Sequence, residues 1–489
     1  MGAADRLRSG LTAEAMAAAA LRAASSDDTL RDLVREDQDA QRELNVLQEQ
    51  LAGQDGAALA DDGRAAARKR LVALEQRRTE LRVLIRGRYP NYDQLASPPL
   101  ADASGVAQRL AGDEALVFML PLAQETVIWT VTANELPVVA RAPIGRDGLA
   151  ALSAQLRRSV TFGNGPLPPF DRRAAAELYQ RLITPVEGSL ATVKHLIVVA
   201  SGPLGSVPFP ALLRTDPADT GRSSWLLDRW TVTQMPTVGA WLTLRSLPPS
   251  PAAPEPFIGW GDPAFALGHA PRDARPAPVS RSAMRYGDLA TLPESRDELQ
   301  GIAASLKADA ARDLVLGPAA TRDSVLAASR AGTLARKRVV VFATHGLGRD
   351  DLPGLDQPAL AMAATPGDAS LLAPLLKLDD VLSLRLNAEW VVLSACNTAA
   401  GDGRDDEALT GLARGFLYAG TRTLLATHWA VETESAKRLT TALFEHWAAH
   451  PTARKAESHR QAMQALAATP RYAHPAYWAP YVLIGEGRR

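Results

Sequence analysis

The spacing of hydrophobic residues divides the chain into a helical start and a longer stretch in which strands and helices alternate. Leucine and valine recur at helical spacing over 30–51 and over 71–85, which predicts two amphipathic helices. A stretch rich in glycine and aspartate separates them, so we expect an antiparallel helical hairpin. The hairpin is expected to serve as a helical cap on the body, as a docking arm for a partner, or as part of a longer helical array.

Short strands follow the hairpin, and helices then alternate with them. The predicted elements are strands at 115–120, 126–131 and 136–142, helices at 148–160 and 172–193, and a strand at 195–200. The first three strands have close turns and predict an antiparallel meander. We therefore predict a first α/β domain over 90–246, closed by a proline-rich linker at 247–256.

The remaining segment, 257–489, predicts a second α/β domain. It begins with a strand at 257–263 and a surface loop, and helices are expected at 294–306 and 321–330. Three continuous aliphatic runs come next, at 338–343, 390–395 and 421–426. Strands that are apolar on both faces belong to a parallel sheet covered by helices. Chemistry in such sheets gathers at the carboxyl ends of the strands.

Composition removes several classes of function. The chain has 489 residues, and 54 Lys and Arg balance 54 Asp and Glu, so we expect no binding to nucleic acid or to an anionic membrane. A single cysteine rules out an internal disulfide and a CxxC metal site, and no cofactor is implied. We read no export or myristoylation signal, and no apolar run approaches the roughly 20 residues of a membrane span. A soluble, cytoplasmic protein is expected.

Two of the three aliphatic runs end in residues suited to nucleophilic chemistry. His345 and Gly346 follow the first run, and Cys396 follows the second, 51 residues after His345. Neighbouring parallel strands would bring both side chains to one rim, and caspases separate His and Cys by roughly 50 residues. A thiol with a pKa of about 8.5 needs an adjacent imidazole to take its proton at neutral pH. We predict Cys396 as nucleophile, His345 as base, and the N–H groups of Gly346 and Cys396 as oxyanion donors.

Each of these residues also has a structural interpretation. Free cysteines are often small buried hydrophobes, and a histidine at a sheet rim is often satisfied by a backbone carbonyl. His428 is a competing base because it closes the third aliphatic run, but bulky Trp429 follows it where a glycine follows His345. We expect Cys396 at the rim because small and polar residues begin there.

Acidic residues follow the second and third runs. Asp402 lies in the glycine-rich loop 401–411, and Glu432 and Glu434 come after the third run. They are expected either to bind a cationic substrate side chain or to be solvated, with capping of the next helix as the alternative for the two glutamates.

At these residues the chain resembles the CHAT family, a caspase-like peptidase domain often joined to tetratricopeptide repeats and distantly related to separase. The matching segments are HLIVVASGPLGSVPFPALL at 195–213, LPESRDELQGIAASL at 292–306, ATHG at 343–346, VVLSACNTAAGDG at 391–403, LTGLARGFLYAGTRTLLATHWAVETES at 409–435 and HPAYWAPYVLIGE at 474–486. The resemblance implies a His/Cys dyad at His345 and Cys396. It also implies a caspase-like α/β fold, with a mainly parallel sheet flanked by helices in the active half.

The predicted architecture is a helical hairpin within 1–89, a degenerate caspase-like half over 90–246 and an active CHAT half over 257–489. The predicted function is hydrolysis of peptide bonds in a protein substrate through a thioester acyl-enzyme. The alternative is a catalytically quiet interaction scaffold in a signalling or defence assembly, and in either case the N-terminal helices are a candidate site for a regulatory protein partner.

Overall fold

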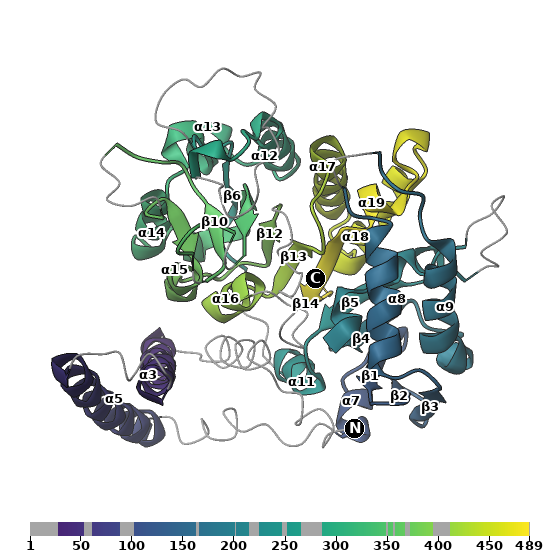
Figure 1. Ribbon diagram of the computed structural model, residues 1–489, viewed down its shortest axis with the longest axis horizontal. Helices are drawn as coiled ribbons and strands as arrows, with labels where there is room; N and C mark the ends of the chain where they lie inside the picture. Colours follow the sequence, from purple (N-terminus) through teal and green to yellow (C-terminus); the bar gives the residue numbers. More distant parts are fainter. Residues whose placement is uncertain are drawn as a thin grey trace. The chain divides into compact units, whose positions relative to one another are not determined.

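The computed structural model describes most of the chain in two compact units, a helical hairpin and an α/β body (Figure 1). The described ranges are 28–52, 61–88, 102–162, 166–200, 202–214, 224–246, 252–265, 286–348, 351–355, 357–366, 372–394 and 411–488. Within these ranges, no helix combines the length and the apolar character needed to cross a bilayer.

The predicted hairpin is confirmed. Helix α3 spans Asp28–Ala52 and helix α5 spans Asp61–Arg88, with a small apolar core between them. Ion pairs join the two helices: Arg70 to Glu43 at 2.6 Å, Arg77 to Glu36 at 2.7 Å and Arg78 to Asp37 at 3.1 Å. Residue numbers rise along one helix as they fall along the other, so the helices are antiparallel. The two exposed pairs, made by Arg70 and Arg77, are expected to add little stability.

The first strands of the body form the predicted meander and then a parallel segment. The strands are β1 Glu114–Pro121, β2 Thr126–Thr132, β3 Val138–Ala142, β4 His195–Ala200 and β5 Thr231–Met235. β2 pairs antiparallel with both β1 and β3, whereas β1, β4 and β5 are mutually parallel. The meander is therefore confirmed, and β5 is a strand that the sequence pattern does not predict.

The three aliphatic runs of the second half form the predicted parallel strands β8 Lys337–Ala343, β12 Trp390–Leu393 and β13 Thr423–Thr427. β6 Glu255–Gly261 is the strand expected at the start of this half, and β7 Leu314–Leu316 is a strand that the sequence pattern does not predict. Their order is β13-β12-β8-β6-β7, and every neighbouring pair is parallel. β6 begins at Glu255, so the end of the predicted linker belongs to a strand.

A single sheet of eleven strands joins both halves. The last strand, β14 (Tyr481–Gly485), lies between β5 and β13 and pairs antiparallel with β13. The predicted boundaries at 89, 246 and 257 stay a prediction, since the sheet is continuous across the two halves. The surface loop expected after 263 lies almost entirely outside the described residues.

Helices cover both faces of the sheet (Figure 1). They are α7 Ala103–Ala107, α8 Arg146–Arg158, α9 Arg172–Leu182, α10 Leu226–Arg229, α11 Val238–Ser246, α12 Pro293–Ser305, α13 Ala310–Asp313, α14 Arg322–Arg330, α15 Leu378–Ser383, α16 Gly411–Ala419, α17 Thr433–Ala449, α18 Lys455–Ala467 and α19 Pro475–Trp478. Alternate residues of β8 and β12 enter two cores, one with α12, α17 and α18, the other with α14, α15 and α16. This two-sided burial explains the continuous aliphatic runs.

Helix α12 approaches β6 closely because two glycines of that strand leave room for it. A Cβ atom added to Gly259 or Gly261 would lie 2.7 or 2.6 Å from the Leu299 side chain. Side chains at these positions would push the helix away from the sheet. The glycines of β6 therefore set the depth at which α12 packs beside β8.

Candidate functional site

The carboxyl ends of β8 and β12 lie side by side, as predicted. Each residue of β12 pairs with the residue 51 positions earlier in β8, from Trp390 with Val339 to Leu393 with Phe342. The ladder extends one step further, because the Ser394 N–H donates to the Phe342 carbonyl at 3.0 Å. The predicted nucleophile Cys396 and the acidic residue Asp402 lie outside the described residues.

His345 is held by a hydrogen bond to the backbone. Its Nε2 lies 2.8 Å from the Ala290 carbonyl oxygen, and its ring is 5.3 Å from the ring of Phe265. A carbonyl oxygen only accepts, so Nε2 carries the hydrogen and Nδ1 is the unprotonated nitrogen of the neutral ring. Burial lowers the pKa of His345, which favours that neutral form. The carbonyl contact that the structural interpretation expects is thus present, and it leaves a basic nitrogen.

A small second sheet fixes the backbone around His345. Strands β9 Gly346–Leu347, β10 Ala359–Ala361 and β11 Leu375–Lys377 form it in the order β11-β10-β9. The Ala361 N–H donates to the His345 carbonyl at 2.9 Å, and Thr344 Oγ1 donates to the Ala361 carbonyl. Gly346 pairs in register with Leu360. The role of Gly346 as an oxyanion donor stays a prediction.

The competing histidine, His428, has a different environment. It is 2% exposed, and its Nδ1 has no hydrogen-bond partner among the described residues. Burial, with a smaller effect of Arg157, lowers the pKa of His428 to about 3. Arg157 Nη2 donates to the His428 carbonyl at 2.6 Å. This ring is a buried neutral group beside α8 and a poor acceptor of protons.

Both glutamates after β13 have local partners. Glu432 is the N-cap of α17, where its side chain accepts a hydrogen bond from the Ser435 N–H at 2.7 Å. Glu434 accepts from Arg438 Nε at 2.8 Å, one turn along the same helix. The capping contact considered for Glu432 is therefore present, while a substrate-binding role for either residue stays a prediction.

A buried carboxyl group that the sequence analysis does not single out lies beside the end of β12. Glu298 of α12 is 2% exposed, and its Oε2 accepts a hydrogen bond from Ser394 Oγ at 3.0 Å. Its Oε1 accepts from Thr440 Oγ1 at 2.9 Å, and Ser394 Oγ is 3.0 Å from the Tyr481 hydroxyl. The signal was available in the helical pattern, because Glu298 occupies the buried stripe of α12 beside Leu299.

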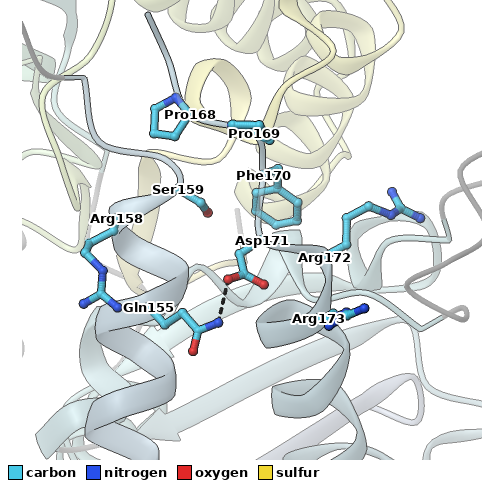
Figure 2. Close-up of a pocket in the computed structure, with 9 residues that line it drawn as sticks. All are labelled: Gln155, Arg158, Ser159, Pro168, Pro169, Phe170, Asp171, Arg172 and Arg173. Carbon is cyan, nitrogen blue, oxygen red and sulfur yellow. Dashed lines mark hydrogen bonds between the residues drawn. The ribbon is translucent and has the colours of Figure 1, made fainter. Parts of the chain in front are cut away.

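A separate cavity of about 710 Å³ lies between α8 and α9. Figure 2 shows Gln155 turned toward Asp171, and Gln155 Nε2 donates to Asp171 Oδ2 at 2.6 Å. Arg158 lies on the α8 side and Arg172 and Arg173 lie on the α9 side, so the three cations do not converge. Asp171 is used as the N-cap of α9. The Ser159 hydroxyl in the cavity donates to the Leu156 carbonyl, so neither it nor Asp171 is left for chemistry, and the described residues include no cluster of metal-ligating side chains.

Comparison with known proteins gives the family. A family model described as the CHAT domain matches residues 172–486, which is more than half of the chain. The chain belongs to the CHAT domain family. The resemblance read from the sequence is thereby confirmed, and both His345 and Cys396 fall inside the part that matches the CHAT model.

Relatives of this CHAT chain are distant. Tetratricopeptide repeat protein 28 of Mus musculus is 26% identical over 381 residues, covering 70% of this chain and 14% of the relative. The separase–securin complex of Saccharomyces cerevisiae is 13% identical with a TM-score of 0.37, covering 92% of this chain and 28% of that one. The Arg-specific cysteine proteinase gingipain R (RGPB) is 9% identical with a TM-score of 0.39, covering 70% of this chain and 74% of that one. The CHAT chain therefore spans a small part of the mouse relative.

Proposed function

We propose that this CHAT domain is a cysteine peptidase with Cys396 as nucleophile and His345 as general base. The supporting observation is the register of β8 and β12, whose paired residues differ by 51 positions. His345 and Cys396 differ by the same number, so the same register, extended by three residues, would pair them. An equal number of steps along both strands keeps the two residues on a shared face.

The register also favours His345 over His428. Each β12 residue pairs with the β13 residue 33 positions later, as Val391 does with Leu424. Extended to Cys396, this register would pair that residue with Trp429 and would leave His428 on the opposite face. The electrostatics agree, because His428 is deeply buried and resists protonation whereas His345 is half-buried.

The proposed reaction uses the tautomer that the Ala290 carbonyl imposes on His345. Nδ1 takes the proton from the Cys396 thiol, and the thiolate sulfur forms a C–S bond to the scissile carbonyl carbon. The tetrahedral oxyanion accepts hydrogen bonds from the N–H groups of Gly346 and Cys396. The C–N bond then breaks, and Nδ1–H gives its proton to the leaving amine. Water, deprotonated by Nδ1, hydrolyses the thioester and the thiol regains its proton.

Labelling of the purified protein with an electrophilic peptide tests this proposal. An acyloxymethyl ketone peptide should alkylate Cys396, and the site is unambiguous because the chain has a single cysteine. We expect this reaction to be faster than that of a simple haloacetamide, since peptide binding positions the electrophile. The label is measured by intact mass and peptide mapping, with Cys396→Ala as the blank.

The scaffold function makes the opposite prediction. If the haloacetamide reacts with Cys396 while a panel of peptide electrophiles does not, the thiol is accessible but no peptide site accompanies it. That result would contradict the peptidase proposal and favour an interaction module.

We propose that an acidic residue in the segment after β12 determines which side chain is preferred before the scissile bond. Glu432 and Glu434 already have partners in α17, so Asp402 is the carboxylate we expect to act on substrate. A peptide library varied at the residue before the cut should show preference for Arg or Lys over Asp, because opposite charges attract in a partly desolvated cleft. Asp402→Asn should reduce this preference by roughly tenfold, the loss of about one ion pair.

Glu432→Gln is the matched control for the library. It removes one negative charge from the same region but retains a side-chain oxygen to cap α17. A preference for Asp in the wild type, or equal effects of the two substitutions, would remove the assignment to Asp402.

A further inference from the structure

A network of polar side chains, buried except for half-buried Ser394, joins the carboxyl end of β12 to three other elements. Ser394 comes directly after β12 and two residues before Cys396. Its hydroxyl contacts Glu298 of α12 and Tyr481, the first residue of β14. Glu298 also contacts Thr440 of α17. Because Ser394 contributes both its backbone N–H and its side chain, the strand end is held along the sheet and from one face.

We infer that Glu298 is a positioning residue for the proposed nucleophile, holding the end of β12 through its hydrogen bond with Ser394. The inference rests on the proposed function of Cys396. Glu298 touches no reacting atom in this scheme and acts through Ser394. A displacement of about 1 Å at a nucleophile can cost roughly a hundredfold in rate, so a contact two residues away is close enough to matter.

The proton on Glu298 changes the direction of these hydrogen bonds. An ionised carboxylate only accepts, so Ser394 and Thr440 both donate to it and Tyr481 donates to Ser394. A protonated carboxyl must donate to one of the two hydroxyls, and that hydroxyl then turns its own hydrogen elsewhere. Ser394 would turn to Tyr481, whereas Thr440 has the Ala436 carbonyl at 3.0 Å. The network therefore has distinct arrangements for the two proton states.

Both proton states are accessible near neutral pH. Burial raises the pKa of Glu298 to about 7, and the hydrogen bonds from Thr440 and Ser394 only partly oppose that rise. The nearby charges are paired with other groups. On α17, Lys437 lies 3.2 Å from Asp297, and Arg438 is bonded to Glu434. The contacts made by Glu298 from α17 and the end of β12 are hydroxyl groups.

Alkylation of the full-length protein by iodoacetamide between pH 5 and pH 9 tests the inference without using peptidase activity. The wild type should show a rate step near pH 7 in addition to titration of the thiol and His345. Glu298→Gln keeps the shape and both kinds of hydrogen-bonding group, so it should behave at every pH like the protonated wild type and lack the step. Ser394→Ala should lower the rate by roughly tenfold and also lack it.

Glu294→Gln is the matched control, because Glu294 is exposed one turn earlier on α12. It should retain the wild-type profile. Urea unfolding midpoints show whether a variant changes the rate because it unfolds. A buried acid whose pKa is raised in the folded protein makes the protein less stable as pH rises toward that pKa, so Glu298→Gln should be at least as stable as the wild type at pH 8. Equal profiles for wild type and Glu298→Gln would overturn the inference. If the step is absent from Glu298→Gln and Ser394→Ala as expected, but neither the wild type nor any variant cleaves peptides, the positioning role of Glu298 stands and the peptidase proposal fails.

Discussion

Replacing His345 by alanine should lower peptide turnover by about 10³- to 10⁴-fold, and replacing Cys396 by alanine should abolish it. The first substitution removes the group that we propose takes the thiol proton, so only the small thiolate fraction present at neutral pH could attack. The second removes the atom that we propose forms the acyl-enzyme. Turnover is measured with the best peptide from the library, and folding is checked by circular dichroism and the urea midpoint.

Two further histidine variants are the controls for this pair. His450 is exposed at the end of α17, so His450→Ala should leave turnover unchanged. His428→Ala should lower stability through the loss of a buried ring, while leaving most of the turnover per folded molecule. If His345→Ala kept substantial turnover and folded His428→Ala lost it, His428 would be the base instead of His345.

The direction in which turnover changes at acidic pH follows from the protonation of His345. In the proposed mechanism the neutral form of His345 is the base, and burial lowers the pKa of His345 below the ordinary value of 6.5. The part of the turnover profile that reports His345 should therefore fall below that value, because protonation of Nδ1 removes the acceptor.

The strands that could be predicted from the sequence are those that are buried on both faces of the sheet. β8, β12 and β13 appear as aliphatic runs because both faces are covered, and their mutual order follows from strand–helix alternation. β5 is fully buried as well, yet its sequence TVTQM is mostly polar and gives no such pattern. The position of β14 depends on pairing with β5, whose residues lie about 250 positions earlier, and local periodicity contains no information on that contact.

The same distinction between local and distant features applies to the candidate site. His345 was predictable because a strand end followed by glycine is a local feature, and its tautomer was not, because Ala290 is 55 residues away. Glu298 lies on the buried face of a predicted helix, but its role depends on Ser394, 96 residues later. The candidate catalytic residues can therefore be predicted from the local sequence, whereas the groups that orient their side chains come from distant segments.

The carboxylate of Glu114 connects distant segments at the start of β1. Glu114 is 2% exposed and accepts hydrogen bonds from three arginines. The contacts are 2.9 Å to Arg245 Nη2, 3.0 Å to Arg454 Nη1 and 2.9 Å to Arg488 Nη2. Arg245 is in α11, Arg454 caps α18, and Arg488 follows β14. One carboxylate therefore joins the start of β1 to α11, to the start of α18 and to the segment that follows β14.

Glu114→Gln should lower the free energy of unfolding by about 3 kcal/mol, because the buried guanidinium of Arg245 loses its nearer carboxylate and keeps only Glu486 at 3.4 Å, while Arg454 keeps Asp113. Burial alone would raise the pKa of Glu114, but the hydrogen bonds from Arg245 and Arg488 outweigh it and lower the pKa to about 2. An acid with a lowered folded pKa stabilises the protein above its unfolded value of about 4.5, and that stability is lost as pH falls toward 2. The wild type should therefore lose about 3 kcal/mol over this interval, and Glu114→Gln should lack that component.

Urea unfolding followed by tryptophan fluorescence measures this effect in the α/β body, because all nine tryptophans lie after residue 128. Glu125→Gln is the matched control, since it breaks a pair with Arg141, whose side chain is 69% exposed, and should cost less than about 1 kcal/mol. Equal losses for the two variants, or an unchanged acid limb in Glu114→Gln, would show that the arginines are satisfied by solvent. A large loss confined to Glu114→Gln would instead mean that the sheet carrying His345 depends for its integrity on an ion network at the start of β1.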